Sequence, residues 1–279
     1  MLRIFSQSCR NVMAVHPTAV IEAGAHIGEE VEIGPFCYVA ATVEIGRGTQ
    51  LAPHVTLLGY TRLGENCRVH SGAVIGDLPQ DVAYQGGISY VHIGDRCTLR
   101  EGVTIHRGTQ PETVTHVGHD CLLMAHSHLG HNVYVGNHVT IANNTLIAGY
   151  AHVGDRAFIS GNCLVHQFTR IGRLAMLSGG TAIQKDVPPF CMTRSLSTNT
   201  IMGLNVVGLR RAGFSAQERQ LLKKALDILY RSQFTTSQAV QHLREQFIHP
   251  LIQEFCDFIS ASERGICHFV RRGEGGDLS

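Results

Sequence analysis

A six-residue repeat of aliphatic side chains, running from Val15 to Ile183, limits what this chain can fold into more than any other feature of it. The repeat places Val, Ile or Leu at twenty-six positions. These positions are Val15 and every sixth residue to Ile75, then Ile93, Leu99 and Ile105, and then Val117 and every sixth residue to Ile183. Each six-residue unit is called a hexad below.

A second inward position accompanies the first. Two residues before each aliphatic position, from Ile21 onward, stands a small or β-branched residue. Examples are Ala19, Cys37, Thr49, Cys67, Cys97, Ser127, Thr145 and Cys163. Two inward positions separated by one outward residue predict a short β-strand in every hexad.

The period of six excludes an α-helix, because 3.6 residues per turn would spread the aliphatic stripe around the whole helix surface. It fits a β-solenoid in which each hexad is one flat face and stacked coils bury a continuous core. Glycines are expected at the corners. They are Gly28, Gly34, Gly46, Gly64, Gly118, Gly130, Gly136, Gly154 and Gly172. The period leaves the handedness open, although the usual rule for parallel crossovers favours a right-handed coil.

Composition indicates a globular protein of the cytoplasm with a substantial core. The 279 residues are 44% hydrophobic and 16% charged, with a net charge of +1, so no bulk attraction to nucleic acid or membrane is expected. No run reaches transmembrane length. The nine cysteines lack a CxxC pair, and five share the small inward slot, which indicates reduced core residues. These five are Cys37, Cys67, Cys97, Cys121 and Cys163.

The chain divides into five segments by pattern. We expect a leader over 1–13, a β-helix over 14–190, a linker over 191–214, an α-helical domain over 215–270 and a disordered tail over 271–279. Loops are expected to leave the coil at 76–92 and 106–116. Capping-box patterns open helices at Ser215 and Thr235, the first running to about Tyr230, and a third helix is expected from about Leu251 to Ile259.

The hexad register sorts the seventeen histidines. His128 points outward from a strand, and His131 lies at the corner after it; His106 and His166 occupy equivalent corners and should also point outward. The pattern HxHxxH, which begins at His126, is weak evidence for zinc because outward residues on a flat strand diverge. Since one flat face offers no deep cleft, we expect a homo-oligomer with its sites at the interfaces.

Five motifs, in this order, give the chain a resemblance to a known family. They are VTIHRGT (103–109), LLMAHSHLGHN (122–132), VHQF (165–168), QKDVPPF (184–190) and GLNVVGLRRAGF (203–214). The chain resembles the acyl-carrier-protein-dependent UDP-N-acetylglucosamine O-acyltransferases of lipid A synthesis. The resemblance implies a mainly β fold, a single-stranded left-handed parallel β-helix followed by a small α-helical domain. It also implies a homotrimer, no cofactor or metal, and a 3-hydroxyacyl group delivered by acyl carrier protein to the sugar 3-hydroxyl.

The resemblance also assigns roles to particular residues. His131 matches the general base, and Gly149 matches the glycine whose N–H stabilises the oxyanion. Residues matching substrate contacts are Gln80, Asp81, His106, His128, His166, Gln167, Asn205 and Arg211. Gly179 and Met176 match positions that limit acyl length. Arg170, Arg173 and Arg210 are candidates for a basic patch that meets the acidic carrier protein.

The chain departs from the family pattern at five positions. Asn132 replaces the aspartate after the catalytic histidine, and an amide can orient the ring but carries no charge. The other four are Ala83 for lysine, Tyr150 for histidine, Val207 for glutamate and Ala212 for arginine. The changes at 83, 207 and 212 keep open an acyltransferase for another amino-sugar nucleotide, and Asn132 keeps open a catalytically silent scaffold or carrier-protein binder. A metal-dependent hydratase like the γ-class carbonic anhydrases is a third alternative, because those enzymes also use β-helical trimers and histidines.

Overall fold

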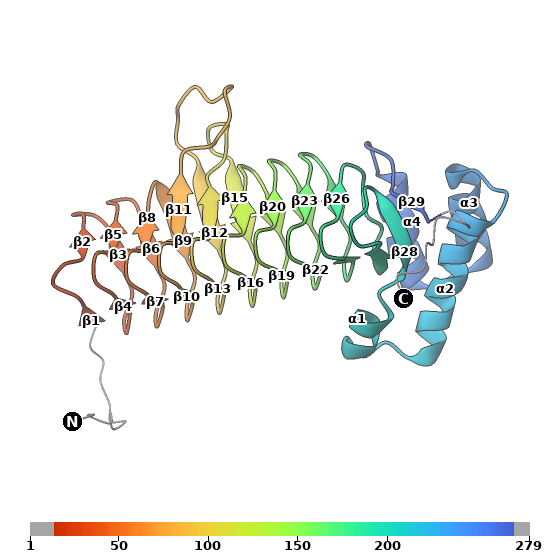
Figure 1. The fold of residues 1–279 in the computed structure, drawn as a ribbon, viewed down its shortest axis with the longest axis horizontal. Helices are drawn as coiled ribbons and strands as arrows, with labels where there is room; N and C mark the ends of the chain where they lie inside the picture. Colours follow the sequence, from red (N-terminus) through yellow and green to blue (C-terminus); the bar gives the residue numbers. More distant parts are fainter. Residues whose placement is uncertain (1–13, 271–279) are drawn as a thin grey trace.

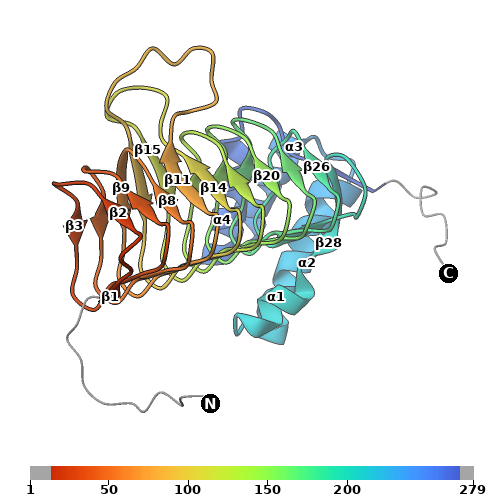
Figure 2. The ribbon, with the colours of Figure 1, turned by 60° about the vertical axis from the view of Figure 1, so that its left-hand side comes forward.

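The computed structural model describes residues 14–270, which form a parallel β-helix with a helical region at one end (Figure 1). In the coils, each strand pairs with the strand three places later in the chain. The strands therefore build three sheets, which form the sides of a prism (Figure 2). The predicted leader and tail lie outside the described residues. No helix within 14–270 has the length and hydropathy needed to cross a membrane.

The first sheet has twelve strands and is parallel as far as β27, with which β28 pairs antiparallel. Its strands are β1 Ala14–Val15, β4 Glu32–Ile33, β7 Gln50–Leu51, β10 Arg68–Val69, β13 Thr98–Leu99, β16 Leu122–Leu123, β19 Thr140–Ile141, β22 Phe158–Ile159, β25 Met176–Leu177, β27 Cys191–Thr193, β28 Thr200–Leu204 and β29 His268–Phe269.

The second and third sheets have nine and eight strands. The second contains β2 Val20–Ile21, β5 Tyr38–Val39, β8 Thr56–Leu57, β11 Val74–Asp77, β14 Thr104–His106, β17 His128–Leu129, β20 Leu146–Ile147, β23 Leu164–Val165 and β26 Ala182–Ile183. The third contains β3 His26–Ile27, β6 Glu44–Ile45, β9 Tyr60–Leu63, β12 Tyr90–Ile93, β15 Val114–Val117, β18 Tyr134–Val135, β21 His152–Val153 and β24 Arg170–Ile171.

The aliphatic positions of the repeat form the core, as the sequence predicts. From Ile33 to Ile183 each of them is at most 3% exposed. Val15, Ile21 and Ile27 are only half-buried, because no coil of the described chain lies below the first one. A fully buried aliphatic side chain contributes about 1.5–3 kcal/mol, so this column is the main source of stability.

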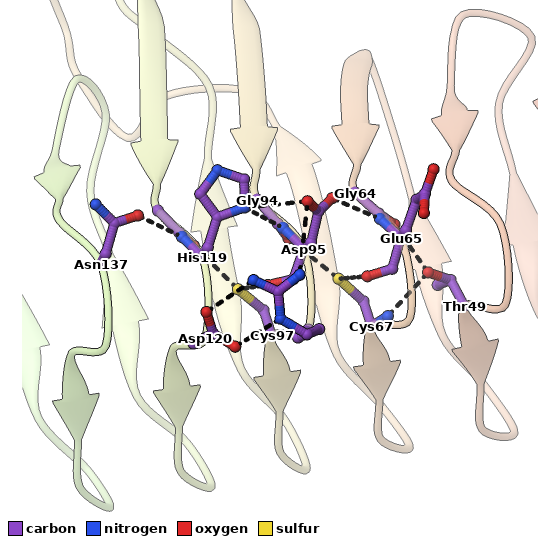
Figure 3. A network of polar contacts seen from close by, with 12 residues as sticks. Thr49, Gly64, Glu65, Cys67, Gly94, Asp95, Cys97, His119, Asp120 and Asn137 are labelled. Atoms are coloured by element: carbon purple, nitrogen blue, oxygen red, sulfur yellow. Dashed lines mark hydrogen bonds and ion pairs between the residues drawn. The ribbon is translucent and has the colours of Figure 1, made fainter.

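The small inward slot also satisfies backbone carbonyls (Figure 3). The thiols of Cys67, Cys97 and Cys121 donate to the carbonyls of Gly94, Gly118 and Gly136 in the next coil, at Sγ–O distances of 3.2, 3.0 and 3.1 Å. All five cysteines of this slot are buried and unbridged, as predicted. Burial raises the pKa of the Cys163 thiol, which keeps it protonated and unreactive.

Side chains at one corner column join successive coils (Figure 3). The N–H of Glu65 donates to Asp95 Oδ1, the N–H of Asp95 donates to His119 Nδ1, and the N–H of His119 donates to Asn137 Oδ1, each at 2.9 Å. Asp155 accepts from Asn137 in the same way at 2.8 Å. Each of these four N–H groups therefore has an acceptor from the following coil, which ties these coils together along one edge of the prism.

The corner glycines are required by contact between coils rather than by backbone conformation. A Cβ on Gly46 would lie 2.5 Å from the carbonyl carbon of Gly64. The left-handed φ values fall two residues later in each corner, for example at Asn66, Asn132 and Asn144. Asparagine tolerates this conformation better than most side chains do, which explains its recurrence there.

Two loops leave the coil on the same side of the prism and lie against each other (Figures 1 and 2). They cover residues 78–89 and 107–113, which is shorter than predicted because β11, β12, β14 and β15 extend into both segments. The N–H of Glu112 donates to the carbonyl of Ile88 at 2.8 Å, and Arg107 Nη2 donates to the Tyr84 hydroxyl at 3.2 Å. The longer loop is therefore supported by the shorter one.

Residues 191–214 are more ordered than the expected linker, since they contain β27, β28 and the helix α1 Val206–Arg211. The first sheet simply continues through them. The three predicted helices follow as α2 Ala216–Arg231, α3 Thr236–Gln246 and α4 Pro250–Ser260. Both capping boxes are present, with Ser215 paired to Glu218 and Thr235 paired to Gln238.

Arg170 and Arg173 attach the helical region to the last coils, so neither is the free surface charge that we expected for carrier-protein binding. Arg170 donates to the carbonyls of Phe258 and Ala261 at the end of α4, at 3.1 and 2.7 Å. Arg173 pairs with Glu254 at 2.7 Å. These contacts place both guanidinium groups between the prism and α4.

Gly46→Ala should lower the free energy of unfolding by about 1–3 kcal/mol, because the new methyl group meets the backbone of the next coil. Gly203→Ala is the matched control, since a Cβ there meets nothing within 4 Å. Urea unfolding followed by circular dichroism measures both variants. Equal midpoints for the two would show that close coil contact does not require glycine at this corner.

Candidate functional site

Seven of the predicted site residues line one pocket of about 490 Å³ on the second sheet, beside the two loops. They are Gln80, His106, His128, His131, Gly149, His166 and Gln167. One coil in this region takes 18 residues, so His131, Gly149 and Gln167 occupy equivalent corners of three successive coils. The repeat therefore brings together residues that are far apart in the sequence.

Asn132 fixes the protonation pattern of the His131 ring. The Asn132 side-chain oxygen accepts the N–H of Thr109 at 2.9 Å, which defines the orientation of the amide. The same oxygen lies 3.1 Å from His131 Nδ1. Because this oxygen can only accept, Nδ1 carries the hydrogen, and Nε2 of the neutral ring keeps its lone pair.

Asp81, on the 78–89 loop, lies at the other side of the ring. Its Oδ2 is 3.6 Å from His131 Nε2, and its Oδ1 accepts the N–H of Ala83 at 2.9 Å. The His131 side chain is only 12% exposed. The imidazole is thus enclosed between an amide and a carboxylate, with Nε2 on the side of the carboxylate.

Gly149 is required by its position next to the His131 ring. A Cβ at this residue would overlap the imidazole and lie 2.5 Å from Nε2. Within residues 14–270 the N–H of Gly149 donates to no acceptor. Other hexads place proline at the same corner position, at residues 17 and 35, so the coil does not need this N–H. A free N–H donor therefore lies close to an imidazole base.

His106 and His128 form the inner wall of the pocket. Their rings meet edge to face with centroids 5.0 Å apart, and Thr104 Oγ1 lies 2.8 Å from His128 Nδ1. Burial lowers the pKa of His106, and it lowers the pKa of the His128 imidazole to about 4. Both rings are therefore neutral near pH 7.

His106 lines the pocket outside the coil, but it is only 6% exposed and so does not face solvent as its corner position suggests. It belongs to β14, which pairs with the end of β11 exactly where both loops leave the coil, and its ladder partner is Asp77. Its Nδ1 has no hydrogen-bond partner among the described residues. A ligand in the pocket could supply one.

The sequence reasoning missed the apolar wall of this pocket. Leu146 and Leu164 point outward from β20 and β23 and are 46% and 51% exposed. The sequence contained a sign of this wall. Leu146 and Leu164 each stand at the outward position between two inward residues, where a solvent-exposed strand carries a polar residue. Tyr150 was also undervalued, because its ring meets His131 edge to face at a centroid distance of 5.2 Å.

The remaining predicted site residues lie elsewhere on the same chain. Asn205, Arg211 and Met176 line a second pocket of about 730 Å³ on the first sheet. Gly179 lies in the turn between β25 and β26. Asn205 caps α1, with its Oδ1 accepting the N–H of Gly208 and its Nδ2 donating to the carbonyl of Leu174, both at 2.9 Å. One copy of the chain therefore does not bring Arg211 to His131.

No cluster of three or more His, Cys, Asp or Glu side chains suited to a metal ion occurs between residues 14 and 270. The three histidines of the HxHxxH pattern also separate in space. His128 and His131 line the pocket, whereas the ring of His126 lies next to Gly102 at a different corner.

Comparison with known proteins gives concordant results. Residues 186–267 match the family described as UDP N-acetylglucosamine O-acyltransferase, domain 2, and residues 24–59 and 115–149 match bacterial transferase hexapeptide repeats. The chain is 43% identical over 255 residues to the acyl-[acyl-carrier-protein]–UDP-N-acetylglucosamine O-acyltransferase of Thermodesulfovibrio yellowstonii, covering 91% of this chain and 98% of that one.

Two solved structures of UDP-N-acetylglucosamine acyltransferases have the same fold. The one from Francisella novicida superposes with a TM-score of 0.89 at 36% identity, covering 92% of this chain and 95% of that one. The one from Bacteroides fragilis gives a TM-score of 0.87 at 38% identity, covering 92% and 100%.

The partial burial of His128 predicts a pH-dependent stability. Its pKa is about 4 in the folded chain and ~6.5 when unfolded, so the unfolded chain binds the proton first as the pH falls. The wild type should therefore lose stability relative to His128→Gln between about pH 6.5 and pH 4. Urea unfolding of both proteins at several pH values measures this difference. A difference in the free energy of unfolding between the two proteins that stays constant with pH would contradict the prediction. His26→Gln, which changes an exposed histidine, is the control.

Proposed function

The chain belongs to the family of acyl-[acyl-carrier-protein]–UDP-N-acetylglucosamine O-acyltransferases, and we propose that His131 is the general base of its reaction. The enzyme transfers an acyl group from acyl carrier protein to UDP-N-acetylglucosamine in the first step of lipid A synthesis. The observation that carries the proposal is the ring geometry: Nδ1 faces an acceptor, and Nε2 keeps its lone pair in the pocket.

The proposed chemistry begins with proton transfer. Nε2 of His131 takes the proton of the sugar 3-hydroxyl, and the oxygen attacks the carbonyl carbon of the 3-hydroxyacyl thioester. The N–H of Gly149 donates to the negative oxygen of the tetrahedral intermediate. When the intermediate collapses, the carbon–sulfur bond breaks, and the departing thiolate takes up the proton from the His131 imidazolium. The products are the acylated sugar nucleotide and the free thiol of the carrier.

The pocket separates polar from apolar contacts in a way that suits these substrates. Gln80, His106, His128, His166 and Gln167 offer hydrogen-bonding groups to the sugar nucleotide. Leu146 and Leu164 offer an apolar surface to a hydrocarbon chain. Gly179 keeps the turn between β25 and β26 open, since a Cβ there would meet only the Gly161 carbonyl at 3.8 Å. We assign the limit on acyl length to this turn and to Met176.

The active assembly in this proposal is a homotrimer. Outward apolar residues occupy the first sheet at Phe158 and Met176 and the second sheet at Leu146 and Leu164, and such patches favour burial between subunits. A contact between two different faces is heterologous, and it closes into a ring of three when each copy is rotated by a third of a turn relative to the last. Pairing the first sheet of one copy with the second sheet of the next brings Arg211 of one copy toward His131 of its neighbour.

Replacing the base gives the direct test of this function. His131→Ala should lower kcat by about 10²- to 10⁴-fold, the usual contribution of a general base. His26→Ala changes an exposed histidine in an early coil and should leave kcat unchanged. The assay follows the O-acylated sugar nucleotide by mass spectrometry. Undiminished turnover by His131→Ala would remove His131 from the mechanism.

Subunit complementation tests the shared site. His131→Ala and Arg211→Ala should each be nearly inactive alone. Among all trimers assembled at random from equal amounts of the two variants, about one quarter of the sites would combine an intact His131 with an intact Arg211 from a neighbour. Co-expression should therefore recover up to roughly a quarter of wild-type activity. Activity that stays at the level of the single variants, or a monomeric enzyme by light scattering, would contradict a site formed between copies.

A further inference from the structure

The surroundings of His131 raise a problem of charge. A general base becomes a cation when it takes a proton, and a buried cation is stabilised by a nearby anion. On the Nδ1 side this chain has the neutral amide of Asn132, where the resembling family has aspartate. The amide can hold the ring and fix its tautomer, but it does not balance the charge.

A carboxylate is present on the opposite side. Within residues 14–270, Asp81 is the only acidic residue in salt-bridge range of the His131 ring, with Oδ2 3.6 Å from Nε2. The other ionisable neighbours do not replace it. His106 and His128 have lowered pKa values and are neutral, and the Tyr150 ring packs edge to face with the imidazole.

The position of Asp81 is fixed by contacts within the loops. Its Oδ1 accepts the N–H of Ala83 at 2.9 Å, and its backbone carbonyl accepts the N–H of Tyr84 at 3.0 Å. The Tyr84 hydroxyl in turn accepts from Arg107 of the shorter loop. With Oδ1 engaged in the loop turn, Oδ2 is left to face the imidazole. The carboxylate is therefore preorganised rather than drawn from solvent.

We propose that Asp81 supplies the negative charge that stabilises the His131 imidazolium, in place of the carboxylate missing at Asn132. This inference rests on His131 being the base. With the ring neutral, the lone pairs of Nε2 and Oδ2 face each other, which is unfavourable. With Nε2 protonated, the same arrangement becomes an ion pair. The carboxylate thus favours the state reached during acyl transfer over the resting state, which is the condition for lowering a barrier.

The expected loss of kcat on removing the Asp81 charge is moderate, because Asn132 sets the tautomer of His131 and Asp81 supplies only the negative charge. Loss of an aspartate bonded directly to a catalytic histidine costs ~10⁴-fold in kcat, largely because the ring takes the wrong tautomer. Here Asn132 holds the tautomer. Asp81→Asn therefore removes only the charge, and we expect kcat to fall roughly 10- to 100-fold with little change in the KM for UDP-N-acetylglucosamine. The asparagine can still accept the N–H of Ala83, so the loop is kept.

A rescue experiment distinguishes a charge partner from a substrate contact. Asn132→Asp returns a carboxylate to the Nδ1 side, so the double variant Asp81→Asn/Asn132→Asp should regain most of the lost kcat. Glu112→Gln is the matched control, because it removes a carboxylate of the neighbouring loop that pairs with Tyr90 instead of His131. It should leave both kcat and KM unchanged.

Two results would overturn the proposal. One is a double variant as slow as Asp81→Asn alone. The other is an Asp81→Asn enzyme whose KM rises while kcat is unchanged, as expected for a residue that only holds the sugar. Failure of the proposed function itself is read separately, from His131→Ala in the same assay. If His131→Ala is slow and the double variant is not rescued, the proposal that His131 is the base stands and the proposal for Asp81 is rejected.

Discussion

The parallel hydrogen-bond ladder between successive coils is the constraint on which the rest of the structure depends. Each strand pairs with the strand three further along the chain, so the aliphatic positions stack in columns inside the prism. Because of this stacking, residues that are 18 positions apart in the sequence lie next to each other in adjacent coils. His131, Gly149 and Gln167 are neighbours for that reason alone. The site is thus a product of the repeat's register, and a shift by one residue would turn it into the core.

The geometry of the proposed site arises where the repeat is interrupted. The two loops follow β11 and β14, the strands that precede β17 in the second sheet, and His131 follows β17 itself. The shorter loop delivers the Thr109 N–H that orients Asn132, and the longer one delivers Asp81. A prism with only flat faces would leave the imidazole in solvent. The loops enclose it and fix both of its sides, while the stacked coils hold its position.

Much of this could be read from the sequence, because a repeat states the inward and outward direction of each residue. The aliphatic core, the unbridged cysteines and the capped helices follow from local pattern, whereas the set of residues around His131 came from the resemblance to the family. The features that could not be predicted from the sequence depend on contacts between residues far apart in the chain. Arg170 resembles a surface charge in its own hexad, yet it binds the end of α4 about ninety residues later. The burial of His106 depends in the same way on two loops whose conformation no period describes.

The contact between copies is a separate matter, because a single chain does not contain it. Arg211 and His131 line different pockets of one chain, so the shared site that we propose needs two copies. The outward leucines at 146 and 164 favour such a contact, because a solvated face would hold polar residues there. Reading outward positions as carefully as inward ones would have singled out these leucines from the sequence.

The most direct test is a structure of the assembled protein with bound UDP-N-acetylglucosamine. The account predicts the sugar 3-hydroxyl oxygen at about 2.6–3.2 Å from Nε2 of His131, with Arg211 of a neighbouring copy at the same nucleotide. A nucleotide bound at Asn205 and Arg211 of one copy, with its sugar out of reach of every His131 ring, would contradict it.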